Sequence, residues 1–269
     1  MSENENAIRI NGFVERTDHG PVTVLTLNRP ERRNALARVV IDQLGDFLAR
    51  AAVEPGVRAV VITGAGPVFC AGMDLKDAAA NADTPEAEKQ AVDDVQAIAD
   101  LIQQVHRLPK PVVAALNGDA YAGGAGLALA CDLVVAAEHA RIGFPEVRRG
   151  LVAAVVLHDL VRQAGERRAR ELLLTGAPIV AATAERWGLV NRVVPADQCL
   201  STALDLARGL VGSGPKAIAT TKHLLDEAGG PADLRGAAAV SAAVRVSEEA
   251  QEGMRAFVEQ RAPRWAEGA

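Results

Sequence analysis

Two short segments rich in small residues each come after an apolar run with the composition of a buried strand. FCAGMDL (residues 69–75) comes after VRAVVITG, and AYAGGAGL (residues 120–127) comes after PVVAALNG. Small residues at the carboxyl end of a strand leave backbone N–H groups open to a ligand, and a helix that begins there favours negative charge. The two segments together are therefore suited to an oxyanion hole, which stabilises negative charge on a carbonyl oxygen.

Few ionisable side chains accompany these segments. Asp74 and Asp132 lie just after a tight turn or at a helix end, where a carboxylate usually accepts hydrogen bonds from local backbone. His158 and Asp159 stand in the apolar run AAVVLHDL (residues 153–160) and are candidates for a pocket wall. The pattern favours a histidine on a helix surface or a hydrogen-bonded histidine in the core, and a catalytic His158 is the alternative. The chemistry near the two segments therefore rests mainly on backbone groups.

The composition predicts a soluble globular protein and excludes several classes of partner. Of 269 residues, 49% are hydrophobic, and the net charge of −5 gives no general attraction for nucleic acid or for an anionic membrane surface. No basic segment leads into an apolar run, and no stretch of about 18 apolar residues occurs, so we expect a cytoplasmic protein without a membrane span. Cys70, Cys131 and Cys199 have no paired spacing, which predicts reduced thiols and no metal site.

A nucleotide cofactor is not expected either. Gly64-Ala65-Gly66 follows a predicted strand, but the third glycine of a dinucleotide-binding turn is missing and no helix opens there. No lysine of a phosphate-binding loop follows.

The apolar patterns predict an α/β core followed by a helical tail. Strands are expected within residues 21–28, 57–64, 111–118 and 132–137, and helices within 35–52, 85–107 and 124–130. This alternation predicts a sheet covered on both faces, within a core of residues 1–195. Residues 196–269 contain four helical segments, separated by GSGP (212–215), GGP (229–231) and the region of Ser247. Their apolar faces require docking on the core or on another subunit.

Five motifs in order make the chain resemble the enoyl-CoA hydratase/isomerase, or crotonase, family. They are LNRPERRNAL (27–36), ITGAGPVFCAGMDL (62–75), KPVVAALNGDAYAGGAGLALACDLVVA (110–136), FPEVRRGLV (144–152) and GLVNRVV (188–194). The resemblance covers about residues 10–265. It implies a spiral of ββα units, a C-terminal helical segment used for trimerisation, often into hexamers, and a coenzyme A thioester as substrate without a further cofactor.

The resemblance also assigns the site. It implies that the backbone N–H groups of Met73 and Gly123 form the oxyanion hole and that Glu146 is an acid/base residue. Hydratases of the family carry a second glutamate, which aligns with Gly126 and is therefore absent. Some hydratase-like branches are similar in this respect. A glutamate placed at 126 is expected to restore the pair if the segment 153–160 leaves room for a water molecule.

The coenzyme A site follows from the same resemblance. It implies that Arg32, the backbone of Ala71 and a C-terminal pair, Phe257 and Arg261, hold the coenzyme, with the C-terminal residues often coming from a neighbouring subunit. Tyr121 is a candidate for the acyl site, with packing as the alternative reading.

Several reactions fit this set of residues. The favoured prediction is an enoyl-CoA hydratase, a hydro-lyase of fatty or branched acyl-CoA metabolism. An enoyl-CoA isomerase using Glu146 alone is the first alternative, because one carboxylate can move a proton between two carbons of an enolate. An acyl-CoA decarboxylase and a catalytically silent protein that binds coenzyme A thioesters are the others.

Overall fold

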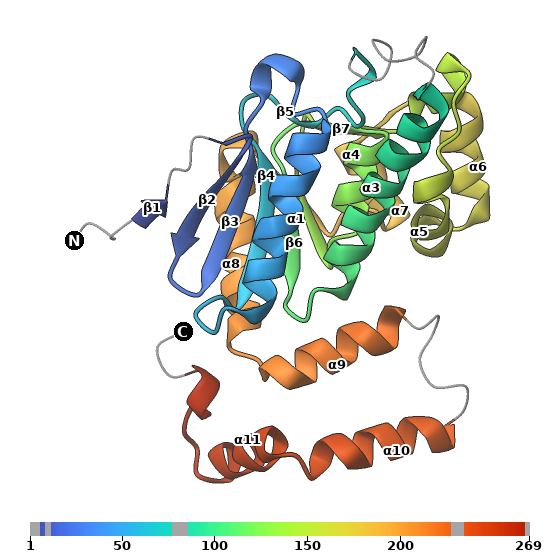
Figure 1. The fold of residues 1–269 in the computed structure, drawn as a ribbon. Helices are drawn as coiled ribbons and strands as arrows, with labels where there is room; N and C mark the ends of the chain where they lie inside the picture. The colour runs from blue at the N-terminus through green and yellow to red at the C-terminus, as the bar shows by residue number, and fades with distance from the viewer. Residues whose placement is uncertain (1–5, 9–11, 77–85, 227–233, 267–269) are drawn as a thin grey trace.

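Nearly continuous apolar runs form the middle of a seven-stranded sheet. The computed structural model describes residues 6–8, 12–76, 86–226 and 234–266 (Figure 1). The strands of this sheet, in the spatial order β1-β2-β3-β4-β6-β8-β11, are β1 (Asn6–Ile8), β2 (Val14–His19), β3 (Val22–Leu27), β4 (Ala59–Gly64), β6 (Val112–Leu116), β8 (Leu133–Ala137) and β11 (Arg192–Val194). Strands β4 and β6 are buried along their whole length, as parallel strands covered on both faces usually are.

The four strands expected from the sequence are confirmed as β3, β4, β6 and β8, which pair in parallel. Strand β2 pairs with β3 in antiparallel register along its whole length, from Val14 opposite Leu27 to His19 opposite Val22. The sequence does not reveal β2, because VERTDH carries charged and polar residues on most of its positions. Its pairing partner, and not its own apolar pattern, defines this strand.

A second sheet is made of four short strands that the sequence pattern does not predict. Its strands, in the order β10-β9-β7-β5, are β5 (Val68–Cys70), β7 (Asp119–Tyr121), β9 (Arg141–Gly143) and β10 (Ile179–Val180). In the parallel pairing of β5 with β7, Val68 lies opposite Asp119 and Cys70 opposite Ala120. The two segments rich in small residues therefore begin as neighbouring strands, and this pairing holds them side by side.

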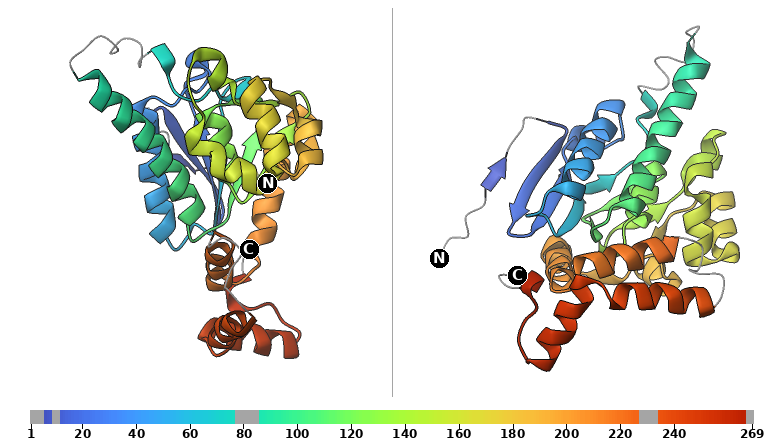
Figure 2. Two further views of the ribbon diagram at one scale, coloured as in Figure 1. Left: turned by 90° about the vertical axis from the view of Figure 1, so that its right-hand side faces the viewer. Right: turned by 60° about the horizontal axis from the view of Figure 1, so that its bottom comes forward.

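Helices cover both faces of the large sheet. Helices α1 (Arg38–Val53) and α3 (Ala87–Arg107) pack together on one face, and α8 (Cys199–Val211) packs against β4, β6 and β8 on the other (Figure 2). Helix α1 begins at Arg38, and not at residue 35, because Leu36 first forms a bridge with Met73. The remaining elements of the core are the helices α4 (Gly123–Leu129), α5 (Ala154–Ala164), α6 (Glu166–Thr175) and α7 (Ala181–Trp187) and the 3₁₀ turns η1 (Pro30–Arg32), η2 (Pro145–Arg149) and η3 (Ala196–Gln198).

The four helical segments expected after residue 196 are confirmed as α8, α9 (Pro215–Asp226), α10 (Leu234–Arg245) and α11 (Glu248–Val258), followed by the turn η4 (Arg264–Ala266). The expected linker at 229–231 lies outside the described residues. Helices α10 and α11 lie away from both sheets, beyond α9 (Figure 1). Large apolar side chains on α11 face solvent, with Phe257 84% and Val258 80% exposed. The tail beyond α8 therefore leaves an apolar surface uncovered by its own chain.

Helix α9 is fixed to the core by a charged side chain. Lys222 Nζ donates to Asp132 Oδ2 at 2.6 Å and to the carbonyl oxygen of Lys110 at 2.9 Å. Asp132 also accepts from the backbone N–H of Val112 at 2.7 Å. Burial raises the pKa of Asp132, and the ammonium of Lys222 lowers it in opposition. The expectation that Asp132 bonds local backbone is wrong, because its carboxylate accepts from the backbone of a neighbouring strand and from Lys222 in the tail.

Replacing Lys222 by methionine is expected to lower the free energy of unfolding by about 1 to 2 kcal/mol, because it leaves the Asp132 carboxylate without its cation. Chemical denaturation measures this loss, and Lys216→Met, on the exposed side of the same helix, is the matched control. Equal stability of the two variants would contradict the anchoring role of Lys222.

Candidate active site

The segments after β5 and β7 touch through their backbones. Gly72 has φ +84°, and a Cβ placed on it would lie 2.7 Å from Ala122 Cβ and 3.1 Å from Gly123 N. Ala122 has φ +52° and ψ −129°, which a residue with a side chain rarely adopts, and its N–H donates to the carbonyl oxygen of Gly143 at 2.9 Å. This strained turn places Gly123 at the start of α4, directly beside Gly72.

Two backbone donors at this contact have no acceptor in the described part of the chain, namely the N–H groups of Met73 and Gly123. The bridge with Leu36 does not use Met73 N–H, because Leu36 N–H donates to Gly72 and Asp74 N–H donates to Leu36. Gly123 precedes the first intrahelical bond of α4, which runs from Gly126 N–H to Ala122. Both donors line the same cavity. The arrangement therefore offers two fixed N–H groups to a negatively polarised oxygen.

Gly72→Ala is expected to lower the free energy of unfolding by more than about 1 kcal/mol, because alanine is strained at this φ and its methyl group meets Ala122. Ala122→Gly is the matched control and is expected to keep or raise stability, since glycine adopts a positive φ freely. Thermal unfolding of both variants measures the difference. A Gly72→Ala protein as stable as Ala122→Gly would show that the contact is not tight.

The cavity has a volume of about 1200 Å³ and reaches from the segment after β3 to the start of α5. Arg32 and Ala71 line one part of it, and Glu146 and Val156 line another, with Met73 and Gly123 also in its wall. The space is large enough for an extended ligand with an apolar portion.

Glu146 is one of the carboxylate residues that line this cavity, which also contains the two N–H donors. It lies in the turn η2, which begins at Pro145 and is followed by Gly150, whose φ of +72° allows its N–H to donate to the Glu146 carbonyl oxygen. The Oε2 atom of Glu146 is buried and has no hydrogen-bond partner in the described structure. Burial raises the pKa of Glu146, opposed by its own N–H and by the charge of Arg149. Glu146 therefore presents a carboxyl group with a raised pKa to the cavity, a property common among groups that transfer protons.

The position of the absent second glutamate is closed by a side chain. Gly126 is buried in α4, and a Cβ there would overlap Val156 Cγ1 and lie 3.1 Å from Ile102 Cδ1. Val156 comes from α5 and faces the cavity. The segment 153–160 therefore fills this space with aliphatic groups, and a glutamate at 126 would require Val156 to shift.

The enoyl-CoA hydratase/isomerase family model matches residues 17–268. The chain belongs to the crotonase family. A Thermus thermophilus protein that bears the name of an enoyl-CoA hydratase is 44% identical over 253 residues, covering 93% of this chain and 99% of that protein. The mevalonyl-coenzyme A hydratase sidH of Aspergillus fumigatus is 38% identical, covering 91% of each chain. A crystal structure of enoyl-CoA hydratase from Bacillus anthracis superposes with a TM-score of 0.84 at 32% identity, covering 93% of this chain and 98% of that one.

These similarities show an acyl-CoA enzyme with the crotonase fold, built from two mixed sheets and C-terminal helices. The fold class expected from the sequence is confirmed.

Within the described ranges, no helix is long and apolar enough to cross a bilayer.

Three of the residues that the crotonase motifs assign to coenzyme A or acyl binding lie in the cavity wall. Arg32 has a buried Nη1 atom with no partner in the described structure. The N–H of Ala71 donates to the carbonyl oxygen of Arg33 at 3.0 Å, so its own carbonyl group is what it offers to a ligand. The Tyr121 hydroxyl donates to Asp119 Oδ2 at 3.1 Å, and burial raises its pKa, so its ring and not its hydroxyl is free to contact an acyl chain.

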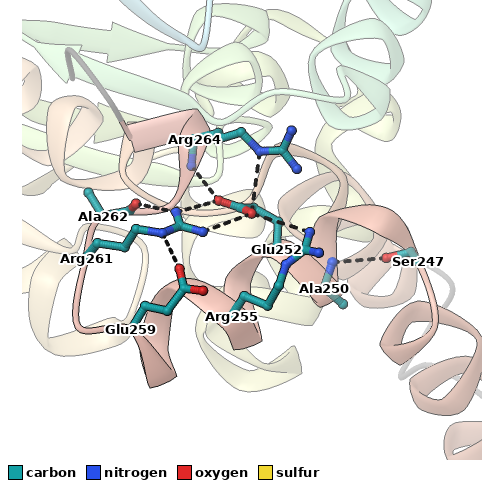
Figure 3. Close-up of polar contacts among 8 residues, drawn as sticks. All are labelled: Ser247, Ala250, Glu252, Arg255, Glu259, Arg261, Ala262 and Arg264. Atoms are coloured by element: carbon teal, nitrogen blue, oxygen red, sulfur yellow. Dashed lines mark hydrogen bonds and ion pairs between the residues drawn. The ribbon is translucent and has the colours of Figure 1, made fainter.

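The other two assigned residues, Phe257 and Arg261, do not line this cavity within the chain. Arg261 instead binds the buried carboxylate of Glu252 at 2.7 and 3.2 Å and Glu259 at 2.6 Å (Figure 3). Arg261, with Arg264 nearby, holds the pKa of Glu252 at about 2. In a single chain Arg261 therefore stabilises the C-terminal turn, and a role for these two residues at a neighbouring subunit's site stays a prediction.

The expected place of His158 and Asp159 at the pocket wall is wrong. His158 is exposed on α5, and Asp159 Oδ2 lies 2.7 Å from Nε2 of His106, which comes from α3. Neither residue lines the cavity. The apolar run that contains them forms an amphipathic helix, whose inner face presents Val156 and Leu160 instead.

A buried ion pair next to Met73 was not predicted from the sequence. Asp74 Oδ1 accepts from the N–H of Lys76 at 3.3 Å, as expected, but its buried Oδ2 lies 3.4 Å from Arg29 Nη1. Arg29 also lies over the ring of Phe13, at 5.3 Å. The motif LNRP contains Arg29, but its partner Asp74 lies far along the chain. No local spacing pattern indicates that these two residues pair.

Proposed function

We propose that this chain is an enoyl-CoA hydratase in which Met73 and Gly123 N–H bind the thioester oxygen and Glu146 is the acid/base residue. The observation that carries the proposal is that an unpartnered carboxylate oxygen of Glu146 shares one cavity with two unpartnered N–H groups. The hydratase names of the Thermus and Aspergillus relatives support the choice of reaction.

The proposed reaction needs each of these groups. Glu146 accepts a proton from water as the water oxygen bonds to Cβ of the α,β-double bond. The electron pair moves through Cα to the thioester oxygen, where the two N–H groups stabilise the enolate, each donor being worth about 3 kcal/mol. Collapse of the enolate takes the proton from Glu146 onto Cα, which restores the carboxylate and leaves a 3-hydroxyacyl thioester.

The isomerase is the second candidate, and Gly126 is the observation that favours it. With Val156 filling the place of a second carboxylate, Glu146 moves a proton from Cγ to Cα of the same enolate without any need to hold water.

We place coenzyme A along Arg32 and Ala71 and the acyl chain beside Tyr121, and we assign Phe257 and Arg261 to the site of a neighbouring subunit. This assignment requires an oligomer, a trimer or a hexamer of two trimers. The exposed apolar side chains of α11, including Phe257 and Val258, support it. Within the chain, the core of residues 1–195 and the tail of 196–269 remain our proposed division.

A panel of acyl-CoAs with products identified by mass tests these reactions. Gain of one water by an α,β-unsaturated thioester supports the hydratase, and conversion of a β,γ-unsaturated thioester without mass change supports the isomerase. Loss of carbon dioxide would indicate a decarboxylase, and binding without any turnover would indicate a silent coenzyme A thioester protein; either result overturns the proposal.

A further inference from the structure

Arg148 is a cation held in a defined place at the cavity wall. Its Nε donates to the carbonyl oxygen of Thr175 at 2.8 Å. Its aliphatic stem lies over Gly176, where an added Cβ would be 3.0 Å from Arg148 Cγ and 3.1 Å from Nε. Gly176 follows the last residue of α6 and has φ +60°. The absence of a side chain there allows this backbone conformation and leaves room for the Arg148 stem. Arg148 is exposed, and within the described residues neither terminal nitrogen of its guanidinium has a hydrogen-bond partner.

The surroundings of Arg148 do not neutralise it. Within the described residues no carboxylate forms an ion pair with Arg148. The adjacent Arg149 donates through Nη1 to the carbonyl oxygen of Pro145 at 3.3 Å, and its charge lowers the pKa of Glu146. Four acidic residues besides Glu146 line the cavity, and they belong to the turn η1, the segment after β5 and helix α3: Glu31, Asp74, Glu88 and Asp94. Two arginines therefore lie two and three positions after the proposed acid/base residue.

Arg148 and Arg32 both line the cavity, and they come from different parts of the fold. It is two positions from Glu146, beside which the reacting carbons must sit, and it rests on the end of α6. Helix α6 is on the opposite side of α4 from β3 and α1, the elements that flank Arg32 (Figure 1). An acyl chain that passes Glu146 therefore approaches this arginine, while the coenzyme extends towards Arg32.

We propose that Arg148 is a specificity-determining residue that binds a carboxylate carried on the acyl portion of the substrate. The proposal rests on the proposed function above and names the substrate class for the same site: acyl-CoA thioesters with a second acidic group. A guanidinium is suited to this task because its planar donors match a carboxylate in a two-point contact. The Arg148 stem is already held against Gly176, so this side chain loses less conformational entropy on binding a ligand than an arginine without such contacts.

Binding of unreactive probes tests the inference independently of turnover. The probes are adipoyl-CoA, whose acyl group ends in a carboxylate, and its neutral monomethyl ester, both saturated at Cα and Cβ. By calorimetry, the intact protein is expected to bind the acid at least about tenfold more tightly than the ester, as a charge-assisted contact implies. Arg148→Met is expected to abolish this preference, and Arg148→Lys to restore part of it. Arg170→Met, an exposed α6 arginine paired with Glu166, is the matched control.

The outcomes separate this inference from the proposed function. If the intact protein binds the ester as tightly as the acid, or if Arg148→Met weakens both probes and free coenzyme A equally, the carboxylate subsite is overturned, and the second result assigns Arg148 to the coenzyme phosphates. If the preference is present but no unsaturated thioester is turned over, the subsite stands and the proposed hydratase fails.

Discussion

Glutamine at position 146 is expected to lower turnover by about a hundredfold to ten-thousandfold while acyl-CoA affinity changes little. The amide keeps the size of the side chain and the turn η2 that positions it, and it leaves the Met73 and Gly123 donors in place. Only the ability to accept and return a proton is lost. Steady-state rates on the best substrate of the panel, together with calorimetric binding of a saturated acyl-CoA, measure the two effects separately.

The pH dependence gives an independent check. Burial raises the pKa of Glu146, and the base must be deprotonated to act. The rate constant kcat/KM is therefore expected to fall as pH drops through this raised pKa, at a higher pH than an ordinary glutamate would give. Glu138→Gln, at an exposed position outside the cavity wall, is the control and should keep both rate and pH profile. Near-normal turnover by Glu146→Gln would remove Glu146 from the mechanism.

The four central strands of the large sheet could be predicted from the sequence because each is long enough to show an apolar pattern. VTVLTL and AVVITG form near-continuous apolar runs, which identify buried parallel strands. The second sheet has strands of two or three residues, too short to carry a period, and β2 is polar. These strands form because a neighbouring strand supplies their hydrogen bonds. Their prediction therefore requires knowing which distant segments pair, and a local sequence pattern does not contain that information.

The same distinction holds for the site. Met73, Gly123 and Glu146 could be assigned because each lies in a local motif with a fixed order of residues. The contact of Val156 with Gly126, and of the Arg148 stem with Gly176, joins segments about 30 residues apart through tertiary packing. No local pattern reports such contacts. The role of Phe257 and Arg261 depends further on a second chain, so even one complete fold leaves it as a prediction.

Gly126→Glu alone is expected to destabilise the protein, and it should not create a hydratase pair. The new Cβ would overlap Val156 Cγ1 and crowd Ile102 Cδ1 in a buried helix. Overpacking of this kind typically costs about 1 to 3 kcal/mol, and a buried carboxylate without a partner adds to that loss. Thermal or chemical unfolding measures the effect, with Gly209→Glu, at a glycine with open space around its Cβ position, as the matched control.

The second substitution Val156→Ala is expected to reverse part of this loss. It removes the overlapping methyl group but keeps Val156 Cβ, which lies 3.6 Å from the Cβ position at 126, an ordinary contact. Because the two sites touch, their effects should not add: Gly126→Glu/Val156→Ala is expected to be more stable than the sum of the two single changes predicts. The opened space connects a carboxylate at 126 to the cavity that Glu146 faces, so the double variant should raise hydration relative to double-bond migration. If Gly126→Glu alone is as stable as the unsubstituted protein and gains hydration activity, then Val156 does not close this position. The absence of a second carboxylate would then need an explanation other than the packing of Val156.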